Sequence, residues 1–258
     1  MSKAVKKNVT IERAEQISND IYSMYLADAA IANQARPGQF VSLYSQDGSQ
    51  LLPRPISICE IDQVRGTIRL VYRVVGKGTE EFSKLQAGDT IPVMGPLGNG
   101  FTMTDCKAIL IGGGIGIPPM LELAKQLHAK GVKVQAVLGY RDELFLNEEF
   151  LNYADVYIST EDGSVGTKGN VIDAIRENNL TADMIYACGP TPMLKGVKSY
   201  AMEHNIKAQI SLEEKMACGI GACLACVCKS KEKDHHSNVN NKRICKDGPV
   251  FYCEEVEL

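Results

Sequence analysis

The segment "AILIGGGIGIPPM", residues 108–120, is the strongest structural signal in this 258-residue chain. An apolar run leads directly into three consecutive glycines, and Pro118 then opens a segment with the apolar spacing of a helix. Proline suits the first turn of a helix, so we expect the helix to begin at Pro118. A dinucleotide phosphate binds at such a turn, although Ile117 takes the place of the last glycine in the usual fingerprint. The residues predicted to hold the phosphates are Gly112, Gly113, Gly114 and Gly116.

Residues 103–210 repeat this alternation of apolar runs and helical segments. The runs "KVQAVLGY", "VYIST" and "MIYACGP" indicate further strands, and "TPMLKGVKSYAMEHN" then has helical periodicity. Strands that alternate with helices form a parallel sheet with helices on both faces. We therefore predict an α/β nucleotide domain over residues 103–210.

Two more positions in this domain are candidate contacts of the nucleotide. Asp142 follows the second predicted strand and is expected to accept a hydrogen bond from an adenosine ribose, whereas Arg141 beside it would suit a 2'-phosphate. We favour NAD over NADP. Cys188 and Gly189 end a later strand at the carboxyl edge, where such sheets bind ligands. A thiol packed at a strand end explains Cys188 about equally well.

Residues 1–102 have a different pattern of apolar and turn-forming residues. Short β-rich runs such as "QFVSLYS" and "TIRLVYRVV" are separated by turn signals, which predicts a small antiparallel β-barrel. In "GKGT", Gly76 and Gly78 let the backbone approach a pyrophosphate, and Thr79 is expected to cap a short helix. Arg54 offers a fixed cation to a phosphate or a flavin edge. A plain turn explains "GKGT" about as well.

Residues 211–258 form a cysteine-rich segment that is too short to build much of a core. Five of the nine cysteines lie within 28 residues. Cys218, Cys223 and Cys226 have the spacing C-x4-C-x2-C of plant-type [2Fe-2S] ferredoxins, and small residues between them leave room for a cluster. Zinc is the alternative, but a closed zinc site usually pairs two C-x2-C knuckles. We therefore predict a [2Fe-2S] domain over residues 211–258.

The fourth ligand is predicted to be Cys245. Cys228 lies too close to Cys226 for both to reach one cluster, and Cys253 lies beyond the Gly248-Pro249 turn. The spare thiols of Cys59, Cys106 and Cys253 are expected to be small buried hydrophobes. The polar stretch 229–242, with His235 and His236, is expected to be a solvated insertion.

Composition and charge exclude several function classes. The net charge is −3 and the pI is near 5.9, which is not the basic footprint of a nucleic-acid-binding protein. No window approaches 18 continuous apolar residues, so we expect no membrane association. Clustered thiols and the lack of a signal sequence favour the cytoplasm.

The order of "RPIS", "GKGT", "GGGIGIPP", "CGP" and a cysteine loop resembles the ferredoxin-NADP reductase superfamily. More narrowly, "SLEEKMACGIGACLACVCK" with "ICKDGPVF" resembles the electron transfer subunits of class 1B, NAD-dependent dihydroorotate dehydrogenases. The resemblance implies FAD on the barrel, NAD on the α/β domain and a [2Fe-2S] cluster held by Cys218, Cys223, Cys226 and Cys245. The implied FAD residues are Arg54, Pro55, Ile56, Ser57, Val71, Tyr72, Arg73, Gly78 and Thr79.

The same resemblance implies a partner. A barrel that oxidises dihydroorotate needs about 250 residues of its own, for which this chain has no room. We therefore expect an FMN-containing catalytic subunit, in a heterotetramer with two copies of each chain. Electrons from dihydroorotate would pass through the cluster and FAD to NAD, in pyrimidine biosynthesis.

Two alternatives remain at this stage. One is the small subunit of a bifurcating ferredoxin-NADP reductase or of a sulfur reductase. The other is a redox-sensing iron-sulfur binding module, against which the intact "RPIS" and "GKGT" motifs argue.

Overall fold

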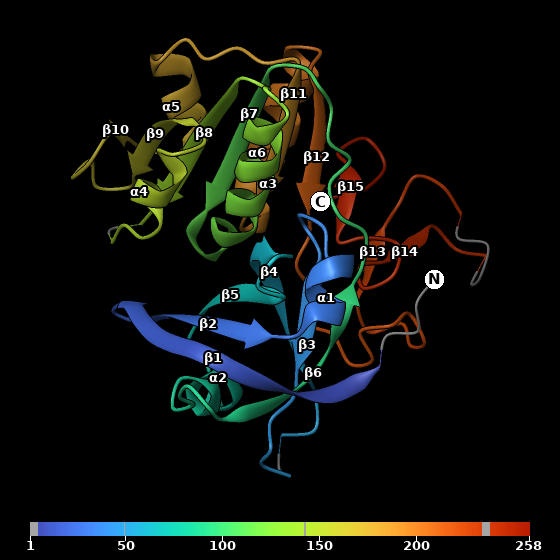
Figure 1. Ribbon diagram of the computed structural model, residues 1–258. Helices are drawn as coiled ribbons and strands as arrows, with labels where there is room; N and C mark the ends of the chain where they lie inside the picture. Colours follow the sequence, from blue (N-terminus) through green and yellow to red (C-terminus); the bar gives the residue numbers. More distant parts are fainter. Residues whose placement is uncertain (1–4, 49, 142, 234–237) are drawn as a thin grey trace.

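Six antiparallel strands in the amino-terminal part of the chain close into a barrel, at the bottom of Figure 1. The structure is a computed structural model, which describes residues 5–48, 50–141, 143–233 and 238–258. The strand order is β1-β2-β5-β4-β3-β6, and β6 pairs with β1 to close the barrel. The strands are β1 (Lys6–Ser18), β2 (Ile21–Ala27), β3 (Phe40–Leu43), β4 (Arg54–Asp62), β5 (Thr67–Arg73) and β6 (Thr90–Leu97). The predicted barrel is thus confirmed.

Two short helices lie between strands of the barrel in the sequence. Helix α1 (Ala29–Gln34) begins after Asp28, whose side chain accepts a hydrogen bond from the amide of Ile31 at 2.9 Å. Helix α2 (Lys77–Phe82) follows β5 and begins after Gly76. Thr79 caps this helix, as the sequence predicts, but from the third helical position. Its hydroxyl accepts from the amides of Val75 and Gly76 at 3.0 and 3.2 Å and so forms a capping box.

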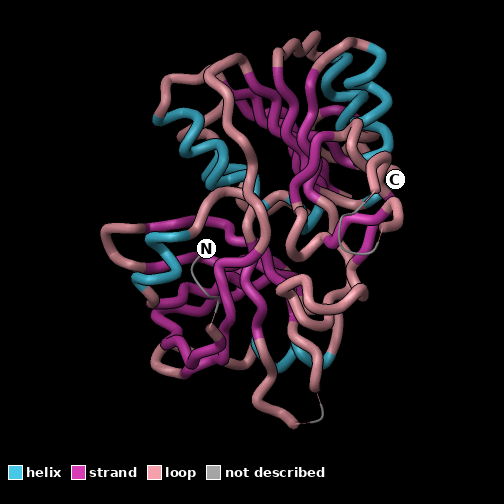
Figure 2. Tube along the Cα trace, turned by 90° about the vertical axis from the view of Figure 1, so that its right-hand side faces the viewer, coloured by secondary structure: helices cyan, strands magenta, loops and turns pink. Residues whose placement is uncertain are grey.

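A seven-stranded sheet forms the upper part of the molecule. Its order is β10-β9-β8-β7-β11-β12-β15, and all neighbouring strands run parallel except β12 and β15. Helices lie on both sides of these strands (Figure 2), as the alternating pattern predicts. The elements are β7 (Ala108–Gly113), η1 (Gly114–Gly116), α3 (Pro118–Ala129), β8 (Val134–Tyr140), α4 (Asn147–Phe150), β9 (Asp155–Thr160), β10 (Thr167–Lys168), α5 (Val171–Glu177), β11 (Met184–Cys188), α6 (Thr191–Glu203) and β12 (Lys207–Ser211).

The two faces of this sheet have separate cores. Helix α3 and Phe150 of α4 pack with Leu110 and Leu138 on one face. Helices α5 and α6 pack with Ile109 and Ile185 on the other. Alternate residues of each buried strand thus supply both cores, which explains why the strands are apolar along their whole length.

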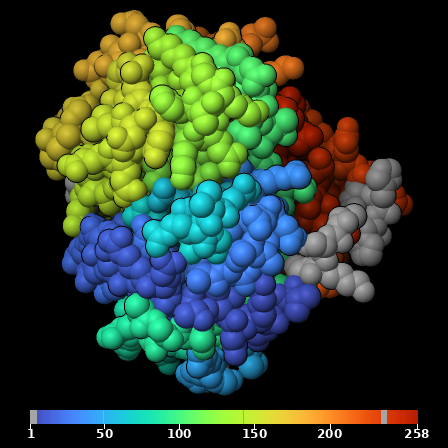
Figure 3. Space-filling view, viewed as in Figure 1, coloured from blue at the N-terminus to red at the C-terminus, as the bar shows by residue number. Residues whose placement is uncertain are grey.

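The carboxy-terminal segment lies against both larger parts, in red at the right of Figures 1 and 3. It forms a hairpin of β13 (Val227–Lys229) and β14 (Asn241–Arg243). The chain then returns to the large sheet as β15 (Val250–Tyr252), which pairs with β12. The cysteine-rich segment therefore supplies an edge strand to the nucleotide sheet, which the sequence did not predict.

Polar contacts connect the barrel to the α/β part. The guanidinium of Arg69 in β5 bonds to Glu149 of α4 at 2.5 Å and to Glu60 of β4 at 2.8 Å. The carboxylate of Glu122 in α3 accepts a hydrogen bond from the amide of Ile61 in β4 at 2.8 Å. Strand β4 is thereby fixed against the helix that follows the glycine turn.

Several smaller predictions can be compared with the structure. Cys59 and Cys253 are buried, as predicted. Cys106 is only half-buried, and its sulfur lies 3.0 Å from the hydroxyl of Thr104, so the prediction of a buried thiol was wrong there. Asp142, His235 and His236 lie outside the described residues. In the described ranges, no helix has the length and apolarity needed to span a membrane.

Candidate functional site

A gap opens between β4 and β5 where their pairing stops, on the side of the chain that leads from β5 to α2. Pairing between these strands ends at Ile58 and Leu70, although both strands continue. The paired strand of residues 54–57 is β3, and that of residues 71–73 is β2. Backbone groups at the two facing edges therefore need another partner. All the strand residues that the resemblance assigns to FAD border this gap.

Arg54 reaches across to the first turn of α2. Its guanidinium donates to the carbonyl of Leu52 at 2.5 Å and to the side chain of Gln50 at 2.9 Å. A Cβ at position 78 would lie 2.8 Å from Nε of Arg54, so a larger residue there would displace this guanidinium. The structure thus brings Arg54, Gly78 and Thr79 together, and their cation and backbone amides fit a pyrophosphate.

The side chains of Val71 and Tyr72 are not exposed in the gap. Both are buried, and the Tyr72 ring lies inside the barrel between Tyr22 and Phe82. Contact of these two residues with a flavin in the gap would use their backbone. Arg73, in contrast, is half-buried and forms an ion pair with Asp20 at 3.2 Å.

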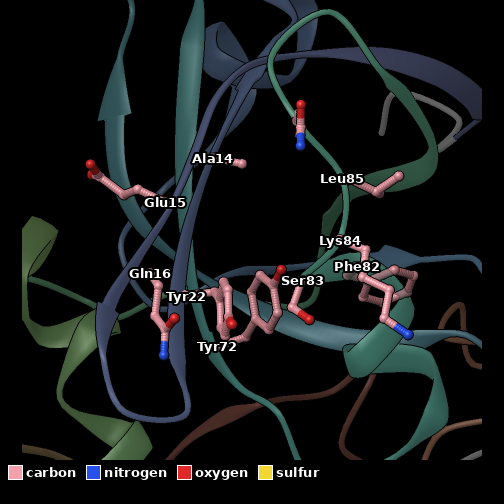
Figure 4. Close-up of a pocket in the computed structure, with 10 residues that line it drawn as sticks. Ala14, Glu15, Gln16, Tyr22, Tyr72, Phe82, Ser83, Lys84 and Leu85 are labelled. Carbon is pink, nitrogen blue, oxygen red and sulfur yellow. The ribbon is translucent and has the colours of Figure 1, made fainter.

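A pocket of about 470 Å³ lies beside the Tyr72 ring (Figure 4). The rings of Tyr22 and Tyr72 stand next to each other at its centre. Its lining residues are Ala14, Glu15, Gln16, Tyr22, Tyr72, Phe82, Ser83, Lys84, Leu85 and Gln86. Tyr72 alone among the predicted FAD residues borders it.

The second site lies at the carboxyl edge of the sheet, between β7 and β11. The chain runs from β7 outward through β8 and β9, then returns to β11 on the other side of β7. Neighbouring strands whose connections leave in opposite directions form a crevice, where open α/β sheets bind ligands. The predicted residues Gly112, Gly113, Gly114, Gly116, Cys188 and Gly189 all lie at this crevice.

Glycine is required where the two loops meet. A Cβ at Gly116 would overlap the carbonyl oxygen of Cys188 and the amide of Gly189. Gly114 has φ +52° and open space where a side chain would stand, so its backbone is accessible to a ligand. Burial raises the pKa of the Cys188 thiol to about 12, so this group is neutral at physiological pH. Helix α3 begins at Pro118, as predicted.

The third site is the cysteine loop, where four thiols lie in two pairs. The sulfurs of Cys218 and Cys223 are 3.3 Å apart. The amide of Cys245 donates to the sulfur of Cys226 at 3.4 Å. Among the described residues, no three His, Cys, Asp or Glu side chains gather as ligands of one metal ion. Two pairs of thiols fit a centre with two irons better than a single zinc.

Backbone amides of the loop are directed at these sulfurs. Burial raises the pKa of Cys218, but the amides of Ile220, Cys223 and Ala222 outweigh it and lower that pKa to about 6. The amide of Gly221 donates to the sulfur of Cys245 at 3.1 Å. Gly219 and Gly221 have φ of +69° and +79°, which these turns require. The loop amides thus favour a thiolate at Cys218, whereas burial and the neighbouring Cys226 raise the pKa of Cys245 to about 12.

Two further residues define the edges of this site. Cys228 donates its thiol to the carbonyl of Lys242 at 3.6 Å, within the β13–β14 hairpin. The buried guanidinium of Arg243 donates to the carbonyl of Gly221 at 3.0 Å and pairs with Asp247 at 3.3 Å. Sequence analysis missed Arg243; its signal is a cation next to the apolar Ile244 and the ligand candidate Cys245.

Three protein families match successive parts of the chain. Residues 8–101 match the oxidoreductase FAD-binding domain, and residues 110–199 match the oxidoreductase NAD-binding domain. Residues 213–257 match the iron-sulfur cluster binding domain of dihydroorotate dehydrogenase B. The chain thus contains domains for FAD, for NAD and for an iron-sulfur cluster.

Several known proteins are similar to the chain over most or all of its length. Proteins named dihydroorotate dehydrogenase B (NAD(+)), electron transfer subunit, are 44% identical in Fusobacterium nucleatum (98% of each chain) and 42% identical in Bacillus cereus (98% of this chain, 99% of the relative). A solved NADH-dependent reduced ferredoxin-NADP oxidoreductase is 32% identical, with a TM-score of 0.87 over 100% of this chain and 91% of its own. A flavohemoglobin from Malassezia yamatoensis, 20% identical with a TM-score of 0.64 over 78% of this chain and 57% of its own, shares the fold alone. By its full-length similarity, the chain belongs to the family of electron transfer subunits of NAD-dependent dihydroorotate dehydrogenase B.

Proposed function

We propose that this chain passes electrons from a dihydroorotate-oxidising partner subunit to NAD. When bound, the iron-sulfur cluster supplies one-electron transfer and FAD supplies the exchange between single electrons and hydride. The protein's own residues hold and align these groups. The proposed cluster ligands are Cys218, Cys223, Cys226 and Cys245.

The observation that carries this proposal is the continuity of the three sites. Gly219 of the cysteine loop lies against Ser42 in β3. Ser42 pairs with Pro55 in β4, the strand that borders the proposed flavin gap. Strand β4 is in turn fixed to α3, which begins directly after the glycine turn of the proposed NAD site. Cluster, flavin and nucleotide sites thus follow one another through neighbouring elements.

We place the partner on the exposed side of the cysteine loop. Ile220 and Leu224, on either side of Cys223, are 50% and 53% exposed. Apolar side chains beside a proposed electron-transfer centre suit a protein partner that must approach that centre closely. We propose that the partner is an FMN-containing catalytic subunit and that two copies of each chain assemble. The clustered thiols favour the cytoplasm as the site of this assembly.

A charged residue introduced beside Cys223 tests whether the partner binds at this surface. Leu224→Arg should weaken co-purification with the catalytic subunit, while Val64→Arg, at a 99% exposed position in the β4–β5 turn, should leave it intact. Light scattering of the complex then measures its mass against two copies of each chain. Equal binding by both variants would place the interface elsewhere.

The test of the function is coupling between two substrates. The isolated chain with FAD should oxidise NADH with a dye acceptor but should not oxidise dihydroorotate. With the catalytic subunit it should convert dihydroorotate and NAD to orotate and NADH. Cys223→Ser should abolish the coupled reaction and spare much of the dye reduction, whereas Cys228→Ser should retain both. Coupling at the normal rate in Cys223→Ser would contradict the proposed path.

The bifurcating-reductase alternative is tested by the same assay. The solved relative of that kind is 32% identical, against 42–44% for the dihydroorotate dehydrogenase subunits, so the latter function is favoured. Failure to couple dihydroorotate to NAD with any FMN-containing partner would reverse this preference.

A further inference from the structure

Ser42 carries a buried hydroxyl without a partner. The residue lies in β3, its exposed fraction is 0%, and its Oγ forms no hydrogen bond among the described residues. Val41 and Leu43 on either side point into the barrel core. Ser42 therefore points the other way, as does Phe40, which packs with residues of the cysteine-rich segment. Buried hydroxyls without a partner are rare and call for an explanation.

The hydroxyl faces the backbone next to a proposed cluster ligand. An ideal Cβ on Gly219 would lie 3.0 Å from Oγ of Ser42. The other atoms around that point are apolar, namely Cδ1 of Leu97 at 3.5 Å and Cε of Met94 at 3.9 Å. Gly219 directly follows Cys218. The positive φ of Gly219 and its missing side chain thus leave the Ser42 hydroxyl room beside this end of the loop.

Tyr44, the residue directly after β3, supports this placement. Tyr44 and Cys218 pack against the same apolar core. The carboxy-terminal end of β3 therefore lies near Cys218.

We propose that the Ser42 hydroxyl donates a hydrogen bond to a sulfur atom of the iron-sulfur cluster at its Cys218 side. Ser42 would then be a positioning residue, supplied by the barrel, that tunes the cluster's reduction potential. Hydrogen bonds to cluster sulfurs are one of the means by which proteins set this potential. One-electron reduction adds negative charge to the sulfurs, so the bond is stronger in the reduced state. The hydroxyl thus favours reduction.

The experiment is a potentiometric titration of the iron-loaded chain, followed by the electron paramagnetic resonance signal of the reduced cluster. In Ser42→Ala, the equilibrium constant for reduction should fall by about tenfold, which is about 59 mV for a one-electron couple. Ser159→Ala is the matched control, because Ser159 is also buried and without a hydrogen-bond partner but lies in β9 of the nucleotide sheet. It should leave the potential unchanged.

Ser42→Cys keeps a weaker donor of similar size and should give an intermediate shift. An unchanged potential in fully loaded Ser42→Ala would overturn the proposal, because the hydroxyl would then form no bond that depends on the charge of the cluster. Loss of iron from both Ser42 variants would also overturn it, because the residue would then support the loop's fold. The inference rests on the proposed ligands, but their failure is distinguishable, since the wild-type chain would then hold no iron.

Discussion

Gly116 is the residue at which the two loops of the NAD crevice touch. Gly116→Ala should force the Cys188 carbonyl and the glycine turn apart, because no Cβ fits between them. Overpacking of this kind costs about 1–3 kcal/mol. We expect the dissociation constant for NADH to rise roughly tenfold or more, with FAD content unchanged, as measured by fluorescence titration.

Gly196 supplies the control for this substitution. It lies inside α6, and an added Cβ would meet only Ile172, at 3.7 Å. Gly196→Ala should therefore leave NADH binding intact and raise the free energy of unfolding by about 0.5–1 kcal/mol. Weakened NADH binding in both variants would show that the effect is not local to the crevice.

Arg243 stabilises the cysteine loop through its contacts with Gly221 and Asp247. Arg243→Ala would leave the carbonyl of Gly221 and the carboxylate of Asp247 without this cation. Removing one partner of a buried pair costs about 3–5 kcal/mol, and partial exposure of Asp247 places the expected loss at the lower end. The visible absorbance of the cluster should bleach several times faster with an iron chelator. Arg176→Ala, at an exposed position in α5, should bleach at the wild-type rate.

At the scale of elements, the sequence predicted most of what is local. The run of residues 108–120 became β7, the glycine turn and α3, because burial and proline act on neighbouring residues. It did not predict β15, since three residues carry too little pattern to reveal a partner strand some forty positions earlier. The burial of Tyr72 and the lack of a hydrogen-bond partner for Ser42 were not predicted either. Both depend on closure of the barrel, which brings together strands that are far apart in the sequence.

The cysteine segment should depend on iron for its order except at its end. Its described residues contain two three-residue strands in the hairpin, whereas Phe251 of β15 is buried in the core of the nucleotide sheet. Removal of iron should therefore expose residues 213–249 to limited proteolysis and leave β15 protected. Mass spectrometry of the fragments measures this. Cleavage spread evenly through the barrel would contradict it.

At the scale of the whole molecule, Arg69 joins the barrel to the α/β part. Its side chain is 5% exposed and also donates to Ser23 at 2.9 Å. Arg69→Ala should lower the free energy of unfolding by about 3–5 kcal/mol and separate the calorimetric transition into two. Glu149→Ala should cost only about 1 kcal/mol, because Glu149 is 41% exposed and Arg69 keeps Glu60. A single transition in Arg69→Ala would show that apolar packing alone couples the two parts.

The two edges of the nucleotide sheet are protected in different ways. On one side, β10 has two residues and offers little to a neighbouring chain. On the other side, β12 has five residues, and β15 covers its backbone groups. A chain ended before Val250 would present an open β12 edge to other molecules, and edge-to-edge stacking into aggregates should follow. The last nine residues thus protect the protein from aggregation, in addition to belonging to the cysteine-rich segment.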